Sequence, residues 1–378
     1  MDIRDFKAGT FIPQFKYKSF LPEKIHKEWI ISDPVVNKLL EEANLKLGEL
    51  NAFSLIVPDV DLFIRMHVVK EATTSSRIEG TQTQIDDALL NEKDINPGKK
   101  NDWKEVQNYI VAMNSAVEKL AKLPVSSRLV KQAHKTLLDN TRGKNKLPGE
   151  FRTSQNWIGG ASIKDAVFVP PHHEDLPGLL SDLEIFLNDQ QMNIPHLIKI
   201  AIAHYQFETI HPFLDGNGRV GRLLITLYLV ANNLLAKPTL YLSDFFEKNR
   251  QLYYDNLNNV RASDNLTQWI KFFLSAVILT ATDGINTFQA ILKLKSRIED
   301  EKIITLGRKL PLAKTFITFL YTSPIVSVSV LVEELGVSKQ TANLVIKDFV
   351  NLNILKEVTG LKRNRLFVFE EYLNLFRK

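Results

Sequence analysis

A glycine-rich segment between two strongly apolar stretches constrains the fold of this chain more than any other feature. Residues 211–222 read His-Pro-Phe-Leu-Asp-Gly-Asn-Gly-Arg-Val-Gly-Arg. The spacing Gly216-x-Gly218-x-x-Gly221 is that of the dinucleotide-binding fingerprint, which must follow a β-strand. The preceding residues 200–207 have a helical pattern instead. The segment therefore predicts a loop between two helices and not a dinucleotide-binding βαβ unit.

The same segment gathers groups that bind anions. Gly216 and Gly218 allow successive backbone N–H groups to face one point, and the helix that follows adds its positive N-terminal end. Arg219 and Arg222 are three residues apart, so both can reach the mouth of this cradle. The pattern predicts a site for phosphate groups.

Two further side chains flank the predicted cradle. The carboxylate of Asp215 at the rim suits Mg²⁺ held against phosphates. His211, at the other end of the loop, is a natural general base near neutral pH. A base, a magnesium carboxylate and a phosphate cradle within so short a segment indicate phosphoryl or nucleotidyl transfer.

Residues 211–222 resemble the HxFx(D/E)GNGRxxR signature of Fic-domain proteins at every fixed position. The resemblance implies AMP transfer from ATP to a Ser, Thr or Tyr hydroxyl of target proteins, and of the enzyme itself. In this interpretation His211 deprotonates the hydroxyl, Asp215 holds Mg²⁺ as cofactor and Phe213 anchors the loop. The residues implied to bind ATP are Gly216, Asn217, Gly218, Arg219, Val220, Gly221, Arg222, Asn249 and Tyr253. Retention of Gly218 favours AMP transfer over kinase activity.

A second motif lies upstream, where residues 75–80 read Ser-Ser-Arg-Ile-Glu-Gly and resemble the (S/T)xxxE(G/N) motif of the family's inhibitory helix. Glu79 would end a helix predicted over 59–79, where a negative charge costs about 0.3–1 kcal/mol. This placement suggests a cationic partner from elsewhere in the chain. In the family the partner is the second signature arginine, here Arg222, and the pair blocks productive placement of the γ-phosphate. The resemblance implies an autoinhibited enzyme; a solvated surface glutamate is the alternative.

Two further segments resemble the family less specifically, at the sites that bind the target protein and the adenine of ATP. Val167, Phe168, Val169 and Pro170 resemble the family's flap hairpin, which docks the target by adding a strand to its main chain. The residues after Asn249 resemble the helix that lines the adenine pocket, although tyrosines at this spacing are also typical of a core. The segment 172–175, which contains two adjacent histidines, is interpreted as a solvated loop. His196 and His204 are interpreted as core or rim histidines.

The basic excess of the chain lies at its C-terminal end. The whole chain has 48 Lys and Arg against 43 Asp and Glu, and residues 301–378 have 12 against 7, so the first 300 residues balance to zero. Three short helices and two alternating strands in this part resemble a winged helix. The basic segment 359–364 at the wing tip suits DNA phosphates. A winged helix for protein contacts or dimerisation is the alternative, and a homodimer is left open.

Together these features predict a mainly α protein: a Fic-type helical core with a short β-hairpin flap and a C-terminal winged-helix domain. The expected division is an N-terminal helical region with the inhibitory helix (1–100), the Fic catalytic core (101–275), a linker helix (276–305) and the winged-helix domain (306–378). The alternative functions are a DNA-binding regulator whose Fic core senses nucleotide, and an enzyme that removes AMP from proteins.

Composition limits the remaining classes of function. The chain has no cysteine, which excludes disulfide scaffolds, thiolate zinc sites and cysteine nucleophiles. Its N-terminus lacks the apolar region of a signal peptide, and its apolar runs stop short of the roughly 18 residues that a membrane span needs. A cytoplasmic location without membrane contact is expected.

Overall fold

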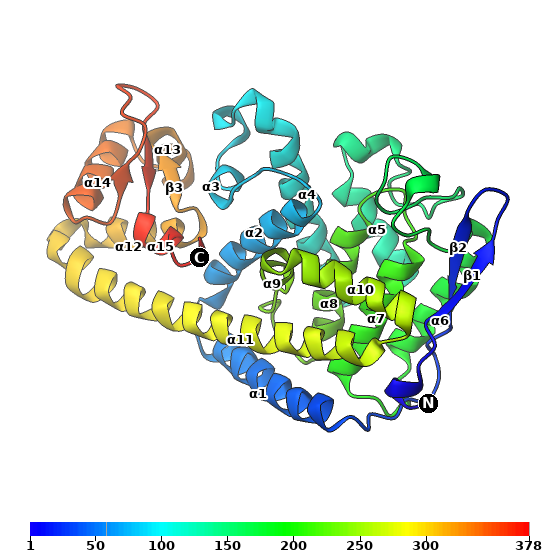
Figure 1. The fold of residues 1–378 in the computed structure, drawn as a ribbon. Coiled ribbons are helices and arrows are strands. Elements are labelled where there is room, and N and C mark those ends of the chain that lie inside the picture. Colours follow the sequence, from blue (N-terminus) through cyan, green and yellow to red (C-terminus); the bar gives the residue numbers. More distant parts are fainter. Residues whose placement is uncertain (58, 378) are drawn as a thin grey trace.

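The computed structural model describes residues 1–57 and 59–377. The fold is mainly α-helical, as predicted (Figure 1). The helices up to residue 296 are α1 (Pro34–Ile56), α2 (Val60–Ile78), α3 (Ile85–Ala88), α4 (Lys100–Lys119), α5 (Ser127–Leu137), α6 (Leu176–Asn188), α7 (His196–Ile210), α8 (Asn217–Ala231), α9 (Ser243–Lys248), α10 (Arg250–Ser263) and α11 (Leu266–Ser296). In the described part of the chain, none of the helices is long and apolar enough to span a membrane.

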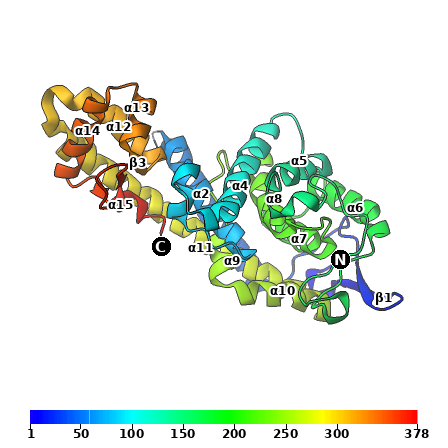
Figure 2. The same ribbon diagram turned by 90° about the horizontal axis from the view of Figure 1, so that it is seen from above.

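The centre of the molecule is the pair α7 and α8, which the loop at 211–216 joins. Every residue of α7 after His196 is buried, which fits a helix whose sequence is apolar on nearly all sides. Helices α4, α5, α6, α10 and α11 surround this pair in Figures 1 and 2. The loop with the signature residues is thus fixed between two core helices.

Helix α2 runs beside this centre and brings residues from far upstream to the loop. It ends at Ile78, Glu79 is its C-terminal cap, and Gly80 follows at φ +102°. The helix end predicted at Gly80 is therefore confirmed, since this conformation favours glycine.

The first 25 residues are rich in Phe, Lys and Pro, which predicts an extended arm, but the structure differs. Strands β1 (Gly9–Pro13) and β2 (Lys18–Pro22) pair as an antiparallel hairpin. The Phe20 N–H donates to Val169 O at 2.9 Å, and the Phe20 and Phe168 rings lie 5.8 Å apart. Burial of the Phe20 ring gives the hairpin an anchor that composition alone does not reveal.

The sequence pattern predicts one helix over 243–262, which is wrong in one respect, because the helix is interrupted at Asn249 between α9 and α10. Asn249 has φ −114° and ψ 35°, and its side-chain amide donates to Phe245 O at 2.9 Å. Asparagine competes with the backbone for hydrogen bonds in this way, which weakens a helix interior.

The C-terminal part contains the three helices and two strands expected from its sequence, and β3 and α15 in addition. Its elements are α12 (Leu310–Thr322), β3 (Ile325–Ser327), α13 (Val328–Leu335), α14 (Lys339–Asn351), β4 (Lys356–Glu357), β5 (Leu366–Val368) and α15 (Glu370–Leu373). The strands form one antiparallel sheet in the order β3-β5-β4. In α14, Ala342, Val345, Ile346 and Phe349 recur at i, i+3, i+4 and i+7, which predicts one apolar stripe, and all four are buried. Ser338, a residue type that favours the N-cap, caps α14 and accepts from Thr341 N–H at 3.1 Å.

Helix α11 connects the two parts of the molecule. It runs unbroken from 266 to 296, packs along α1, and continues through a π-helical segment η7 (Arg297–Lys302) and a 3₁₀ segment η8 (Ile303–Lys309). The expected linker boundary at 275/276 therefore falls inside a continuous helix. In Figure 1 this helix extends from the C-terminal part to the helices around α7.

Candidate active site

The loop after α7 is closed by its own residues. The Asn217 side chain accepts from Phe213 N–H at 2.8 Å and donates to Phe213 O at 2.8 Å. His211 takes the left-handed conformation at φ 50°, and Gly216 does so at φ 78°. A left-handed conformation in a non-glycine residue costs about 1–3 kcal/mol and is common at functional sites. Surrounding contacts must therefore hold His211 in place.

The residue that supplies most of these contacts is Arg152, which the sequence did not single out. Its guanidinium is buried, with Nε donating to His211 O at 3.0 Å and Nη2 to Pro171 O at 2.6 Å. Burial lowers the pKa of Arg152 to about 10. Asn156 Nδ2 donates to Phe213 O at 2.9 Å. Together they tie both ends of the flap to the loop.

His134 supports the loop from α5 and was also missed. Its ring stacks on Phe213 at 3.7 Å, and Phe213 is fully buried, as its anchoring role requires. Nδ1 accepts from Gly149 N–H at 2.9 Å, so Nε2 carries the proton donated to Asp215 O at 3.0 Å. Burial lowers the pKa of His134 to about 4, which keeps the ring neutral.

The His211 imidazole is half-buried, and its Nδ1 has no hydrogen-bond partner among the described residues. Burial and the positive charges of Arg261 and Arg152 lower the pKa of His211 to about 3. The ring is therefore neutral at pH 7 and able to accept a proton.

The predicted contact between Glu79 and Arg222 is present. Arg222 is buried and donates from Nη2 to Glu79 Oε1 at 2.7 Å. It also donates from Nε to Ser75 Oγ at 2.9 Å and from Nη2 to Ser75 O at 2.8 Å. Burial opposes ionisation of Glu79, but Arg222 outweighs it and holds the pKa of this carboxyl below its ordinary value.

The carboxylate of Glu79 also reaches the first turn of α8. A Cβ atom on Gly218 would lie 2.2 Å from Glu79 Oε1. The Glu79 carboxylate therefore lies at the N-terminal end of α8, where backbone N–H groups and the helix dipole attract negative charge. Gly218 gives this anion room to approach the backbone.

Arg219, the other arginine of the signature, contacts different residues. Arg219 is buried and donates from Nη1 to Glu105 Oε2 of α4 at 3.1 Å. Its Nη2 lies 3.5 Å from Asp215 Oδ1. The side chain of Asp215 remains 41% exposed at the rim, which leaves its oxygens accessible.

Glu208 lies on α7, one turn before the loop, and sequence reasoning did not select it. It is buried, and its Oε1 has no partner among the described residues. Burial raises the pKa of Glu208 to about 7. A Cβ atom on Gly221 would lie 2.1 Å from this Oε1, so the third glycine of the signature makes space for Glu208.

The residues predicted to contact ATP do not all line the cradle. Tyr253 is 1% exposed, and its hydroxyl lies 2.9 Å from His204 Nε2, while His204 Nδ1 donates to Gly221 O at 2.9 Å. Tyr253 therefore supports α8 through its contact with His204. His196 and His204 are satisfied, as expected, since His196 Nδ1 lies 2.8 Å from Tyr228 OH. Nucleotide contacts of Tyr253, Asn249 and Val220 remain predictions.

The flap is shorter than a regular hairpin. Ile158 and Phe168 form a single antiparallel bridge, with Ile158 N–H donating to Phe168 O at 2.8 Å. Of the four predicted docking residues, Val167 is 69% exposed, whereas Phe168, Val169 and Pro170 are buried. Target docking stays a prediction, and Val167 is its most accessible member.

Comparison with known proteins agrees with this site. Residues 37–118 match the Fic/DOC family N-terminal model, and residues 124–229 match the Fic/DOC family model. Residues 124–229 therefore carry the Fic domain that the signature predicted.

Two curated relatives are named Protein adenylyltransferase Fic. The one from Aedes aegypti is 38% identical over 117 residues, covering 31% of this chain and 21% of the relative. The one from Drosophila grimshawi is 35% identical over 132 residues, covering 32% and 25%. The chain thus matches about a quarter or less of the length of these relatives.

Solved structures support the fold. A Fic family protein from Desulfovibrio desulfuricans G20 has a TM-score of 0.58 at 19% identity, covering 91% of this chain and 98% of that one. A Fic domain containing signaling protein from Bacteroides thetaiotaomicron VPI-5482 has a TM-score of 0.54 at 18% identity, covering 68% and 97%.

Proposed function

We propose that this protein is an autoinhibited protein adenylyltransferase, which transfers AMP from ATP to a Ser, Thr or Tyr hydroxyl of target proteins and of itself. The observation that carries the proposal is the anion cradle at α8, where Glu79 pairs with Arg222 at 2.7 Å, with the neutral His211 at the other end of the loop. The names of the curated relatives support the same reaction class.

In this mechanism His211 takes the proton of the target hydroxyl while the hydroxyl oxygen attacks the α-phosphorus of ATP. A bond forms between that oxygen and phosphorus, and the bond from the α-phosphorus to the α,β-bridging oxygen breaks, releasing pyrophosphate. Arg222 and the N-terminus of α8 bind and orient the phosphates. Arg152 acts on the reaction only by holding the loop that carries His211.

Asp215 is the residue that would hold Mg²⁺. Its carboxylate is the kind of hard oxygen donor that Mg²⁺ prefers, and its exposure leaves room for water and phosphate oxygens as the other ligands. The ion would supply positive charge that neutralises the phosphates during transfer.

Glu79 would inhibit by two effects. Its Oε1 takes up one donor of Arg222, and its negative charge lies where α8 attracts a phosphate. ATP could then enter only with its γ-phosphate displaced, and the α-phosphate would be out of line for attack.

The test of this function is incubation of the intact protein and its Glu79→Gly variant with cell lysate and labelled ATP. Label in the α position should appear on protein, more strongly with the variant, and label in the γ position should not. Transfer of γ label would indicate a kinase instead, and no transfer of either label by the variant would overturn the proposal.

The Asp215→Ala variant is expected to lose AMP transfer even in excess Mg²⁺, because the rim would no longer hold the ion. The measurement is α-label transfer in the Glu79→Gly background, with Asp139→Ala as an acidic control outside the cradle. Activity that survives EDTA would remove Asp215 from this role.

A second candidate function is DNA binding by the C-terminal part, proposed as a winged-helix domain over 306–378; its last residue lies outside the described residues. The helix and strand order from α12 to β5 favours it, and Lys362 and Arg363 are exposed in the loop between β4 and β5. In this division, 1–100 carries the inhibitory helix, 101–275 is the catalytic core and 276–305 links it to this domain.

Full-length protein is therefore expected to bind duplex DNA with an affinity that falls steeply as salt rises. Replacing Lys362 and Arg363 by Glu should weaken binding at low salt, whereas the same charge change at Lys38 and Lys122 should not. Gel-shift titration at several salt concentrations measures this. Absence of binding at low salt would assign the domain to protein contacts or dimerisation.

A further inference from the structure

Glu208 is a buried carboxyl that the proposed mechanism does not use. It lies on α7, one turn before His211, and is 6% exposed. Its Oε1 has no hydrogen-bond partner in the described part of the chain. A protein interior strongly disfavours a carboxylate that lacks such partners, so this position favours the neutral, protonated form of the side chain.

The two arginines whose charges act on Glu208 direct their donors to other acceptors. Arg261 of α10 donates from Nη2 to the main-chain O of Glu208 at 3.1 Å, and not to its carboxyl. Arg222 of α8 donates to Ser75 Oγ at 2.9 Å and to Glu79 Oε1 at 2.7 Å. Both cations therefore attract the Glu208 carboxyl only at longer range.

The remaining titratable groups around Glu208 do not favour its ionised form. Burial raises the pKa of Tyr253 on α10 well above its ordinary value, so this phenol is neutral, and the ring of His211 is neutral as well. Burial raises the pKa of Glu208 to about 7, and the negative charge of Glu79 on α2 acts in the same direction.

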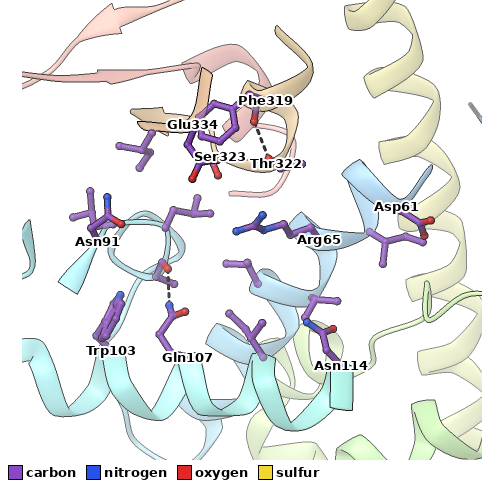
Figure 3. A pocket seen from close by; sticks show the side chains of 18 of the residues that line it. Asp61, Arg65, Asn91, Trp103, Gln107, Asn114, Phe319, Thr322, Ser323 and Glu334 are labelled. Atoms are coloured by element: carbon purple, nitrogen blue, oxygen red, sulfur yellow. Dashed lines mark hydrogen bonds between the residues drawn. The ribbon is translucent and has the colours of Figure 1, made fainter. Parts of the chain in front are cut away.

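The cavity shown in Figure 3 does not open towards Glu208. This cavity of about 830 Å³ lies between α2, α4 and the C-terminal helices, and no residue of α7 or α8 is among the described residues that line it. The solvent in it therefore does not stabilise a charge on Glu208.

Two glycines of α8 place Glu208 beside the anion cradle. Gly218 and Gly221 are three residues apart, so they share one face of the helix, with about 5–6 Å between their Cβ positions. A Cβ atom on Gly218 would lie 2.2 Å from Glu79 Oε1, and one on Gly221 would lie 2.1 Å from Glu208 Oε1. The two carboxyls therefore lie within about 10 Å of each other along this face. A phosphate near the position of the Glu79 carboxylate would be repelled by ionised Glu208 and not by its neutral form.

We propose that Glu208 links nucleotide binding to protonation: its carboxyl carries a proton when phosphates occupy the N-terminal end of α8, and its ionised form opposes them. Linkage gives the direction of the effect. Bound phosphates raise the pKa of Glu208, so binding takes up a proton wherever the pH lies between the pKa of the free protein and that of the complex. In that range the affinity falls as the pH rises.

The inference rests on the proposed function only for the place of the phosphates. It concerns affinity, so at saturating ATP the rate of transfer is not expected to depend on Glu208.

The first test measures the affinity of full-length Glu79→Gly protein for ATP in excess Mg²⁺ between pH 6 and pH 9. The affinity should fall about fivefold or more over this range. Addition of Glu208→Gln removes the ionisable group and should make the affinity level. Addition of Asp182→Asn is the matched control, because it removes the charge of another buried carboxyl, on α6, and should leave the fall unchanged.

The second test requires no substitution at Glu208. The heat of ATP binding to Glu79→Gly protein is measured at several pH values in two buffers that differ in their heat of protonation, and the difference gives the protons taken up. Net uptake is expected, and it should be absent with Glu208→Gln. An equal fall in affinity with and without Glu208→Gln, or no uptake at any pH from 6 to 9, would overturn the inference. Binding with this pH dependence but without transfer of α label would contradict the proposed function alone.

Discussion

Replacing His211 by Ala is expected to slow AMP transfer by roughly 10²–10⁴-fold, the usual contribution of a general base. The physical reason is that the ring of His211 is neutral and only half-buried at the end of the loop, so it can accept the proton of an incoming hydroxyl. ATP binding should change little, because Ser75 holds Arg222 and Glu105 holds Arg219, and neither arginine depends on this imidazole.

The measurement is the rate of α-label incorporation in the Glu79→Gly background, with nucleotide affinity determined separately. His172→Ala is a suitable control, since His172 is half-buried after the flap and lies outside the cradle. Undiminished transfer by His211→Ala would remove this residue from the mechanism.

The dependence of the transfer rate on pH tests the role of His211 independently. An ordinary histidine would become protonated below pH 6.5, and the rate would fall there. Because burial lowers the pKa of His211 to about 3, its neutral form persists, and the rate should stay level from pH 7.5 down to about pH 5. Loss of Glu79 lowers this pKa further, because its negative charge opposes the shift. A fall centred near pH 6.5 would contradict the buried environment of His211.

The residues that could be predicted from the sequence are those that share one short segment or one motif. His211, Asp215 and the glycines follow from their spacing alone, and the contact between Glu79 and Arg222 follows from a charge at a helix end together with the family motif. The structure adds the reason for two glycines: Gly218 admits the Glu79 carboxylate, and Gly221 admits Glu208.

The residues that could not be predicted act through distant or non-specific contacts. Glu105 reaches Arg219 across 114 positions. Arg152 binds backbone carbonyls, which every residue has, and so leaves no pattern in the residues it holds. His134 acts through one ring stack and two backbone contacts. Contacts of this kind become visible only when the helices are placed in space.

The elements of the fold also divide into those that periodicity predicts and those that it does not. Long amphipathic helices such as α4 and the buried stripe of α14 were predictable from periodicity. The hairpin β1–β2 was not, because its stability depends on Phe20 packing against Phe168, nearly 150 residues away. The break at Asn249 is confined to the backbone angles of one residue, which periodicity does not register.

The Glu79→Gly variant is expected to transfer AMP about tenfold faster than the intact protein, or more. A hydrogen bond between charged groups contributes about 1.5–3 kcal/mol, and 1.4 kcal/mol corresponds to a factor of ten. The lower end applies because the side chain of Glu79 is 33% exposed and solvent weakens the pair. Few single substitutions raise the rate of an enzyme, so an increase would be difficult to explain without release of Arg222.

Three further proteins separate inhibition from other effects of this substitution. Glu79→Gln keeps the size of the side chain and removes its charge, so it should also be activated, which excludes a change in the end of α2 as the cause. Glu79→Gly combined with Arg222→Ala should fall back, since the released arginine is then missing from the phosphates. Glu247→Gly removes a carboxylate that pairs with Arg77 at 3.7 Å outside the cradle and should behave like the intact protein.

Mass spectrometry for added AMP on each protein and on its targets decides between the outcomes. High modification in both Glu79 variants, with loss in the double variant, is expected if Glu79 inhibits by holding Arg222 and the mouth of α8. High modification in the double variant would mean that Glu79 acts by its own charge in the cradle and that Arg222 is dispensable. Equally low modification in intact protein and both Glu79 variants, while label transfer remains measurable, would mean that inhibition does not reside in Glu79. The contact at 2.7 Å would then be a structural ion pair that stabilises the end of α2.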